Sequence, residues 1–548
     1  MDHGHSPERF GPSAASGVLV SSSDQRPIRS HRAAVERVAS SLAACLGLLA
    51  LLALVALAYG PAVPGFFVSD DFDMLSGAAS DLFSPASGFG RFMPVAATAH
   101  RLTALLSGLN PIPPHAVQVG LHGAAALLVY ALGRTLGLGR GAAWAAAALW
   151  ALYPRHHQAV MWFGAIAIGL AGLFGLAAIY LFGRAWREGT ARAGWTAVGA
   201  NALALLSHES AVVLPALAAA VGVYLTATRR APRPCWPPPA WVWAALAVGA
   251  VHLGTVAWAY RVRAALYPDS GYRFVGLGAE LAQAPLRYAA WLVAPPPWTE
   301  AWTAGTAGLL VGIPTLLGAG VWAWRGGALA RLGVAWGGVA ALPVVLFGVY
   351  GMTDRYCYLP TVGVALAVVS GLAGRRWARS ALALYVLVCG TLLVGVAAEW
   401  RAAGASTRST LDALATWATA AAPARPEAVL LVGVPFKRAT TWPGSQVYVF
   451  STGVVGATHL ATGWPALRVS YTFLDEYPTL PAQLAALPVA PGPPGLHLLA
   501  LGPEFSDHTP RLGAALPLLE PLRWRGASRL PVEWQRYRVW STSAGPSP

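Results

Sequence analysis

The sequence has little charge and almost no lysine. Only 11% of its 548 residues are charged, and Lys437 is its single lysine, so arginines supply nearly all of the positive charge behind the formal net charge of +15. Hydrophobic residues make up 56% of the chain and the mean hydropathy is +0.51, whereas soluble proteins are roughly 45–50% apolar. The arginines lie in short clusters between apolar runs, a pattern typical of membrane proteins. We therefore expect one large membrane domain with an appendage, and no nucleic-acid partner.

Cysteine is also scarce, which bears on disulfide and metal chemistry. The chain has four cysteines, none of them in a CxxC pair, at positions 45, 235, 357 and 389. Cys45 and Cys389 fall inside apolar runs, so we expect four free thiols rather than a disulfide framework or a zinc site. No other ligand cluster has a convincing spacing for a metal ion. The sequence therefore predicts neither a metal nor a cofactor.

Long apolar runs fill most of the chain before residue 399. A helix needs about 20 apolar residues to cross a bilayer. On that rule we predict eleven spans, at 39–59, 115–133, 141–153, 158–182, 195–207, 209–228, 240–259, 304–324, 329–349, 356–373 and 380–398. The first span follows a polar segment, 1–37, that we expect to be disordered. This first span is longer than the apolar region of a cleavable signal peptide, which has roughly 7–15 residues. We therefore predict that it is retained as a membrane helix.

The arginine clusters predict an orientation. With eleven spans they all lie on the side of the N-terminus, at 26–37, 134–140, 184–192, 229–233, 325–331 and 375–379. The positive-inside rule makes this side cytoplasmic. The opposite side then holds a first outer loop, 60–114, most of the acids and everything after about residue 399. We expect a multi-pass protein of the bacterial inner membrane whose functional face is periplasmic.

The composition changes near residue 399, where apolar segments shorten and proline becomes more frequent. Runs typical of strands follow at 427–435, 445–455, 496–504 and 534–542. The predicted fold class is therefore mainly α. A polytopic membrane helix bundle at 38–398 carries a small C-terminal α/β domain at 399–548, on the outer face.

The predicted topology gathers polar residues on the outer side. The stretch GFFVSDDFDML places Asp70, Asp71 and Asp73 just after the first span. The same loop contributes Arg91, and other outer loops contribute His156, Gln158, His208, Glu209, Asp354, Arg355 and Tyr358. Ionisable groups at membrane depth are costly and commonly mark a functional path. Their placement on one side favours a shared site over separate structural roles.

Each of these residues also has a structural interpretation. Asp70 could be only a helix N-cap with Asp73 in the first turn, which leaves the adjacent Asp71 unexplained. The same holds in the other loops, where each polar residue taken singly could serve as an interfacial group or a local partner. The alternatives are an interfacial His156, a structural pair of His208 with Glu209, and a local ion pair of Asp354 with Arg355.

Adjacent carboxylates together with basic residues suit glycosyl transfer. A carboxylate can accept the proton of an acceptor hydroxyl as that hydroxyl attacks, and a neighbouring acid raises the pKa of one member of a pair. The sequence does not decide between Asp70 and Asp71 as this base. Arginine binds a phosphate leaving group in a bidentate manner, so Arg91 and Arg355 are candidates, with His156 as a further donor. One attack assisted by one base inverts the anomeric carbon.

An ordered set of motifs resembles a known family. SDDFDML, RFMPVAATAHRL, YPRHHQAVMW, LLSHESAVVLP and DRYCYLPTVG follow one another over about 60–375. Together they resemble the GT-C class of polytopic glycosyltransferases, in particular the protein O-mannosyltransferase-like branch. The resemblance implies a catalytic base in the first outer loop, at Asp70 or Asp71. It also implies a polyprenyl-phosphate-linked sugar as donor, with basic residues such as His156 and Arg355 at its phosphate.

The chain departs from the family pattern at the turn after the third span. A pattern like HPxHxExVxW is expected there, but Tyr153 replaces the first His and Gln158 replaces the Glu. The following stretch, 165–170, lacks the expected Arg and Asp, His208 stands where the family has Lys, and no TPR array follows. These changes indicate a different sugar or acceptor, or a weakened or inactive enzyme.

The main prediction is an integral membrane hexosyltransferase. It moves a sugar from a polyprenyl-phosphate carrier, undecaprenyl phosphate in a bacterium, to a protein hydroxyl, a lipid or a glycan on the outer face. Two other hypotheses stay open. A transporter or flippase of lipid-linked glycans would show repeat symmetry and broken helices at the midplane, and a non-catalytic membrane scaffold would interact through its C-terminal domain.

Overall fold

The computed structural model describes most of the chain. The described residues are 26–76, 92–231, 239–266, 279–293, 306–345, 353–372, 374–423, 426–437, 447–450, 453–502, 505–522 and 524–526. The chain divides into two compact units, Met1–Leu49 and Ala50–Pro548. Helix α1 (Arg26–Tyr59) starts in the first unit, and all later elements belong to the second. The predicted site residue Arg91 and the predicted strand at 534–542 lie outside the described residues.

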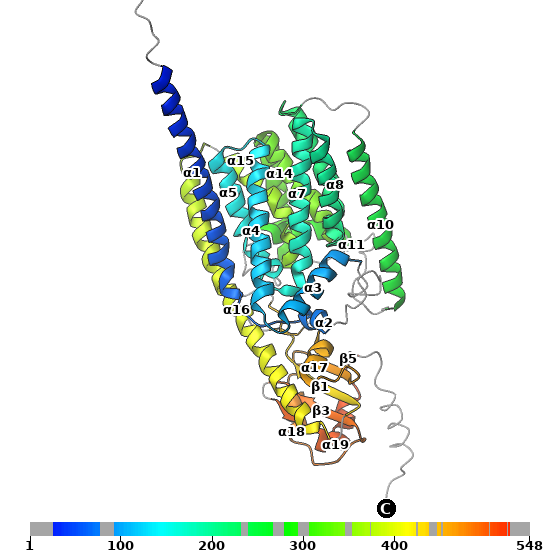
Figure 1. The fold of residues 1–548 in the computed structure, drawn as a ribbon. Helices are drawn as coiled ribbons and strands as arrows, with labels where there is room; N and C mark the ends of the chain where they lie inside the picture. Colours follow the sequence, from blue (N-terminus) through cyan, green and yellow to red (C-terminus); the bar gives the residue numbers. More distant parts are fainter. Residues whose placement is uncertain are drawn as a thin grey trace, which may run out of the picture. The chain divides into compact units, whose positions relative to one another are not determined.

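Seven helices in the described ranges are long and apolar enough to cross a membrane. They are α1, α4 (Ile112–Thr135), α7 (Ile166–Glu188), α9 (Leu214–Ala227) together with the 3₁₀ turn Glu209–Val213 before it, α10 (Ala240–Leu266), α14 (Gly327–Val345) and α16 (Ala378–Ala421). Large apolar side chains stand exposed on them, such as Val251 of α10 at 72% and Leu387 of α16 at 66%. Apolar exposure on this scale fits lipid better than water, which supports a membrane protein. Figure 1 shows these helices as coiled ribbons.

The other predicted spans also overlap helices, although shorter or less apolar ones. These helices are α5 (Arg140–Ala151), α8 (Ala191–Leu205), α13 (Thr306–Arg325) and α15 (Pro360–Leu372). All eleven predicted ranges therefore contain helix, which confirms the mainly α fold class. The number of crossings and the orientation stay predictions, because length and composition support seven spans among the described residues.

Small residues let neighbouring helices approach closely. A Cβ added at Gly333 of α14 would lie 2.5 Å from the carbonyl oxygen of Gly363 on α15. One added at Gly175 of α7 would lie 3.0 Å from a methyl group of Leu214 on α9. Membrane helices commonly associate through small residues of this kind, because lipid offers no hydrophobic gain for association. The many alanines and glycines of the sequence thus serve helix packing.

Short elements connect the long helices. Those at the candidate site are η2 (Gly60–Ala62), α2 (Asp71–Leu75), α3 (Pro94–Ser107), η3 (Pro154–His156), α6 (His157–Met161), η4 (Phe163–Ala165), η5 (Glu209–Val213) and η7 (Asp354–Cys357). A further helix, α11 (Ala279–Val293), lies in a range for which no helix was predicted. Proline begins α3 and η3, because it has no backbone N–H to lose in a first turn. These short elements hold most of the chemically active side chains.

The C-terminal part folds as a small mixed sheet with helices. Its strands are β1 (Ala428–Val434), β2 (Arg468–Phe473), β3 (Leu496–Ala500), β4 (Ser506–Asp507) and β5 (Arg525–Gly526), in the order β4-β3-β1-β2-β5. The central strand β1 is parallel to β2 and β3, and the two short edge strands are antiparallel. Three helices accompany them: α17 (Val454–Thr462), α18 (Leu480–Ala485) and α19 (Leu512–Leu519). A short 3₁₀ turn, η8 (Thr509–Arg511), precedes α19.

The sequence predicted two of the three longer strands. The ranges 427–435 and 496–504 contain β1 and β3. The prediction of a strand over 445–455 was wrong in its second half, because Gly453 adopts a positive φ of 73° and α17 begins at Val454. Among the described residues of this range, only Tyr448 makes a bridge, with Lys437. Strand β2 was missed.

Candidate functional site

Asp71 ties the first outer loop to the short elements after α5. It is fully buried, and its carboxylate accepts the Val68 N–H at 2.9 Å and the Gly164 N–H at 2.6 Å. Burial and the neighbouring Asp70 raise the pKa of Asp71 well above its usual range, while the two backbone N–H groups oppose this rise. A carboxylate held by two amides is fixed in position. Asp71 therefore orients the loop that carries Asp70.

Asp70 occupies the N-cap position of α2 but makes no capping hydrogen bond with its side chain. The preceding Ser69 has a positive φ of 56°, an uncommon conformation for a residue with a side chain. A Cβ added at Gly164 would lie 2.5 Å from Oδ1 of Asp70 and 3.1 Å from Oδ1 of Asp71. The two carboxylates thus converge on a glycine, and only glycine fits there.

The third acid of the loop serves the C-terminal part instead. The Asp73 carboxylate accepts hydrogen bonds from the backbone N–H groups of Gly456 and Gly453, at the start of α17. Burial raises the pKa of Asp73 to about 6, against these two hydrogen bonds and the nearby His459. An acid at a helix N-terminus is favoured by the orphan N–H groups and the helix dipole. Asp73 therefore joins the loop to α17 rather than to the Asp70–Asp71 pair.

A buried ion-pair network lies behind the pair. Arg155 donates to Asp354 at 2.7 Å, and His157 Nε2 donates to the other Asp354 oxygen at 2.8 Å. The indole N–H of Trp400 donates to His157 Nδ1 at 3.0 Å, which places the His157 proton on Nε2 because an indole only donates. Burial raises the pKa of Asp354, but Arg155 and His157 outweigh it, so the pKa is lowered overall. The network holds η3, α6, η7 and α16 together.

Asp354 and Arg355 do not form the local pair that was one alternative. Asp354 pairs with Arg155, whereas the Arg355 guanidinium lies over the ring of Trp162 at 5.0 Å and over that of Tyr356 at 5.2 Å. Arg355 is half-buried, and its backbone N–H lies 3.4 Å from the Gln158 side-chain oxygen. A cation over indole is stabilised by the electrons of the ring face. Arg355 is thus held close to the carboxylate pair.

Trp162 stands between the acids and this arginine. The virtual Cβ of Gly164 lies 3.1 Å from the indole nitrogen of Trp162, the same distance as from Oδ1 of Asp71. Trp162 is almost fully buried, at 4% exposure. Its N–H makes no well-formed hydrogen bond to any described residue. A buried donor of this kind is costly unless a ligand or water satisfies it.

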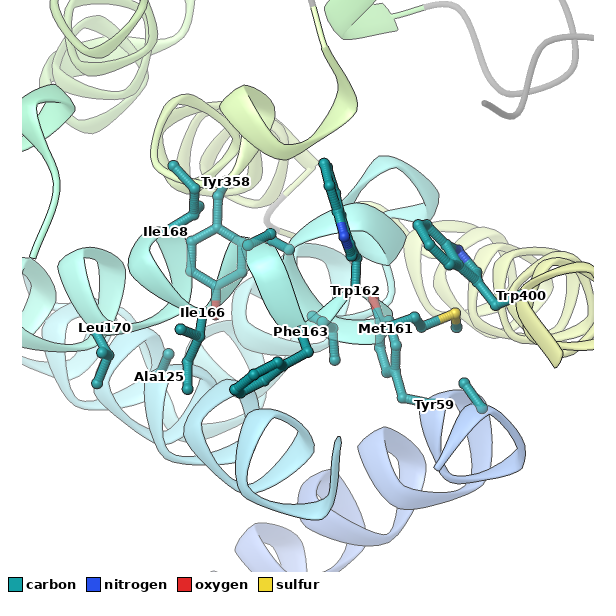
Figure 2. Close-up of a cluster of buried hydrophobic side chains, with 14 of the residues drawn as sticks. Tyr59, Ala125, Met161, Trp162, Phe163, Ile166, Ile168, Leu170, Tyr358 and Trp400 are labelled. Carbon is teal, nitrogen blue, oxygen red and sulfur yellow. The ribbon is translucent and has the colours of Figure 1, made fainter. Parts of the chain in front are cut away.

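The surroundings of Trp162 fix its ring. It stacks against Trp400 of α16 at 6.3 Å between ring centroids and lies 5.8 Å from Tyr448. The Gln118 amide of α4 donates to the Trp162 carbonyl at 2.7 Å. Figure 2 shows Trp162 beside Trp400 within a cluster of buried side chains. Contacts from several elements therefore hold the indole in one place.

His208 and Glu209 are connected to Arg355 through Ser210 and Tyr356. His208 Nδ1 accepts the Ser210 N–H at 3.1 Å, and its Nε2 lies 3.8 Å from a Glu209 oxygen. The His208 ring packs against Tyr356 at 5.8 Å. Ser210, Arg355 and Tyr356 line one pocket, with apolar walls from Ile168, Gly172, Val344, Leu359 and others. The motifs LLSHESAVVLP and DRYCYLP thus meet in space.

His156 and Tyr358 belong to a buried aromatic cluster. His156 Nε2 lies 2.9 Å from the Thr361 hydroxyl, and the Tyr358 hydroxyl lies 2.9 Å from His122 Nδ1. Burial, reinforced by His122, lowers the pKa of His156 well below its usual range. The ring is fully buried, so no phosphate reaches it in this arrangement. These partners explain His156 as a packing residue between the short elements and α15.

Sequence reasoning missed several residues of this site. Arg155, His157 and Trp162 lie inside the motif YPRHHQAVMW, and Gly164 follows it, yet none was given a role. Trp400 lies far downstream, and no local pattern links it to His157. Uncharged hydrogen-bond donors and glycines do not stand out in the charge pattern of a sequence, so they are recognised only from their positions in the folded chain. Among the described residues, no group of three or more His, Cys, Asp or Glu is arranged to hold a metal ion.

The comparisons with known proteins identify no relative. No family model matches the chain, and no curated protein matches it significantly in sequence. The functional argument therefore rests on the site itself.

Proposed function

We propose that the protein is an integral membrane glycosyltransferase of the polyprenyl-phosphate-sugar-dependent kind. The observation that carries this proposal is the convergence of Asp70 and Asp71 on Gly164, beside the buried indole N–H of Trp162 and an arginine on the indole face. A base, a hydrogen-bond donor and a cation for a leaving phosphate therefore lie together. Seven apolar helices put this group in a membrane protein.

The different environments of the two acids suggest their roles. Both oxygens of Asp71 are engaged by backbone N–H groups, and Asp71 is fully buried. Asp70 is half-buried and makes no capping hydrogen bond. We assign Asp70 as the general base and Asp71 as the residue that positions it. This assignment chooses between the two candidates for the general base that the sequence left open.

The reaction balances with one base and one leaving group. The acceptor hydroxyl oxygen forms a bond to the anomeric carbon while the bond from that carbon to the phosphate oxygen breaks. The electron pair of the broken bond stays on the polyprenyl phosphate, and Asp70 accepts the hydroxyl proton. Attack opposite to the phosphate inverts the anomeric configuration.

Arg355 is the described cation best placed for the phosphate. It is half-buried and lines the pocket that also contains Ser210 and Tyr356. An arginine offers two parallel N–H donors to phosphate oxygens. His208 and Glu209 support this pocket through Ser210 and Tyr356.

The proposal includes an orientation. Eleven crossings put the arginine clusters in the cytoplasm and the acids at the outer membrane surface. The donor is then a polyprenyl-phosphate sugar of the outer leaflet, and the acceptor is a protein hydroxyl, a lipid or a glycan outside the cell. The inner membrane of a bacterium is the compartment that fits this arrangement.

A test in membranes separates the proposal from its alternatives. Membranes that contain the protein are supplied with radiolabelled polyprenyl-phosphate sugars, and label that moves from the lipid to an acceptor is counted. We expect transfer from at least one donor, reduced at least about tenfold in Arg355→Gln. The matched control is Arg192→Gln, which removes the same charge from an exposed position of α8 that does not line the pocket. Protein-dependent movement of lipid-linked glycan across the bilayer without transfer from any donor would establish the transporter instead, and neither activity would favour the scaffold.

A further inference from the structure

A second ligand-sized recess lies between α5, α15 and α16. Its walls are largely apolar, with contributions from Ala142, Ala145, Leu149, Val369, Leu372 and Leu382. Three arginines of the α15–α16 connection and the start of α16 line it as well: Arg375, Arg376 and Arg379. All three are exposed. We call this recess the arginine groove.

The arginine groove is far from the carboxylate pair. Helix α5 begins at Arg140, next to the groove residue Gly141, and ends at Ala151, just before the YPRHH segment of the candidate site. Helix α15 begins at Pro360, just after η7, and ends at the groove residue Leu372. A helix of this length spans about 18–20 Å. The arginine end of the groove and the candidate site therefore lie at opposite ends of the same two helices.

The chemistry of the groove changes along its length. The apolar wall of α5 runs from Ala142 to Leu149, about 10 Å of helix, which fits within one leaflet of a bilayer whose hydrocarbon core is about 30 Å thick. The arginines stand at one end of this wall. Trp377, between them in the sequence, is 54% exposed, and tryptophan favours the membrane–water boundary. The arginine end therefore lies at the level of lipid headgroups.

We propose that the arginine groove binds an anionic diacyl phospholipid of the leaflet on that side. The headgroup phosphate contacts Arg375, Arg376 and Arg379, and one acyl chain lies along the apolar wall of α5 and α16. Charge complementarity selects this occupant, because three cations favour a net negative lipid over a zwitterionic one. The proposal concerns a different site from that of sugar transfer and does not depend on it.

Lipid retention by the purified full-length protein tests this assignment. Native mass spectrometry from detergent compares phosphatidylglycerol, phosphatidylcholine and undecaprenyl phosphate, each titrated at the same concentrations. We expect phosphatidylglycerol to be retained over phosphatidylcholine. We expect each arginine-to-glutamine change in the groove to weaken phosphatidylglycerol retention by about fivefold, and Ala145→Phe, which fills the apolar wall, to weaken it as well.

The control removes the same charge elsewhere. The triple variant Arg192→Gln, Arg325→Gln and Arg331→Gln changes exposed arginines that do not line the groove, and we expect it to retain phosphatidylglycerol like the wild type. Its counterpart is the groove triple variant Arg375→Gln, Arg376→Gln and Arg379→Gln. Thermal unfolding confirms that each variant is folded, and Arg379→Gln alone replaces the groove triple variant if that variant is not. Equal losses in groove and control variants overturn the proposal. So does arginine-dependent retention of undecaprenyl phosphate in preference to phosphatidylglycerol.

Discussion

Asp70 and Asp71 are adjacent in the chain and differ in surroundings. Two backbone N–H groups hold Asp71, while Asp70 is half-buried beside Gly164. The fixed carboxylate positions the reactive one beside it. The charge of one carboxylate also opposes ionisation of the other. At the scale of single residues, Gly164 decides how close the two acids come to Trp162.

Gly164→Ala tests this close approach. The added methyl group would lie 2.5 Å from Oδ1 of Asp70, so the carboxylate must move. We expect sugar transfer to fall at least about tenfold, because small misplacements of a catalytic group are costly, while the melting temperature changes little. Gly199→Ala is the control, since a Cβ there meets nothing within 4 Å. Full activity of Gly164→Ala would show that the acids do not act at this point.

The acids could be predicted from their adjacency in a chain with few charges, and their partners could not. Asp71 needs the Gly164 N–H, and Arg355 needs the ring of Trp162. Neither of these two contacts can be predicted from the neighbouring sequence. His156 shows the opposite case, because its outer-loop position favoured a phosphate contact, whereas packing buries it completely.

At the scale of elements, the loop between η2 and α2 is held from two sides. The Thr407 hydroxyl of α16 donates to the Phe67 carbonyl at 2.6 Å, and a Cβ at Gly404 would lie 2.6 Å from Phe66 backbone atoms. On the other side, the Ser69 N–H donates to the Val449 carbonyl at 2.8 Å. Asp73 adds the contact with α17. The C-terminal part and α16 therefore position the loop that carries the proposed base.

The burial of Asp73 gives stability a defined pH dependence. The pKa of Asp73 is about 6 in the folded chain and 3.8 without the fold, so the folded chain binds this proton more tightly. The contribution of Asp73 to the free energy of unfolding is then complete below pH 3.8 and is lost as the pH rises through about 6. It amounts to at most about 3 kcal/mol. Chemical unfolding of wild type and Asp73→Asn between pH 4 and pH 7 measures it as the difference between the two profiles.

The exposed Asp475 provides the control for this experiment. Asp475→Asn should follow the wild-type pH profile, because no buried contact depends on that carboxyl group. An Asp73→Asn profile parallel to the wild type from pH 4 to pH 7 would contradict the proposed linkage.

Helix α16 shows what composition predicts and what it leaves open. The predicted span ended at 398, where charged residues begin, but the helix continues to Ala421. Leu411, Leu414 and Trp417 are buried along this extension, and Trp417 packs on Trp464 at 5.9 Å. The change in composition therefore marks the predicted exit from the membrane, whereas the helix ends where its packing surface ends.

At the scale of the whole molecule, the proposed eleven crossings would put the two chain ends on opposite sides of the membrane. A reporter fused after Pro548 tests this arrangement. We expect a C-terminal alkaline phosphatase fusion to be active and a C-terminal green fluorescent protein fusion to be dark, since each folds on one side only. The same reporters fused after Thr228, next to the arginine cluster at 229–233, should give the reverse pattern. A fluorescent C-terminal fusion would put the C-terminal part, and with it Asp73, which contacts that part, on the cytoplasmic side.

Composition and the arginine pattern predicted a helical membrane protein, because both follow from the solvent that surrounds the helices. The site depends instead on long-range pairing. Arg155 meets Asp354, and His157 meets Trp400, across long stretches of intervening chain. One sequence contains no signal for such pairs, so the buried network emerges only from the folded chain.

The most direct test of the central claim is the initial rate of sugar transfer by the purified protein when Asp70 alone is changed. Asp70→Asn keeps the size of the side chain and removes the base, so we predict a rate at least about 100-fold lower, an unchanged melting temperature and full activity in Asp475→Asn. An Asp70→Asn protein that transfers sugar at the wild-type rate would contradict the assignment of Asp70 as the general base.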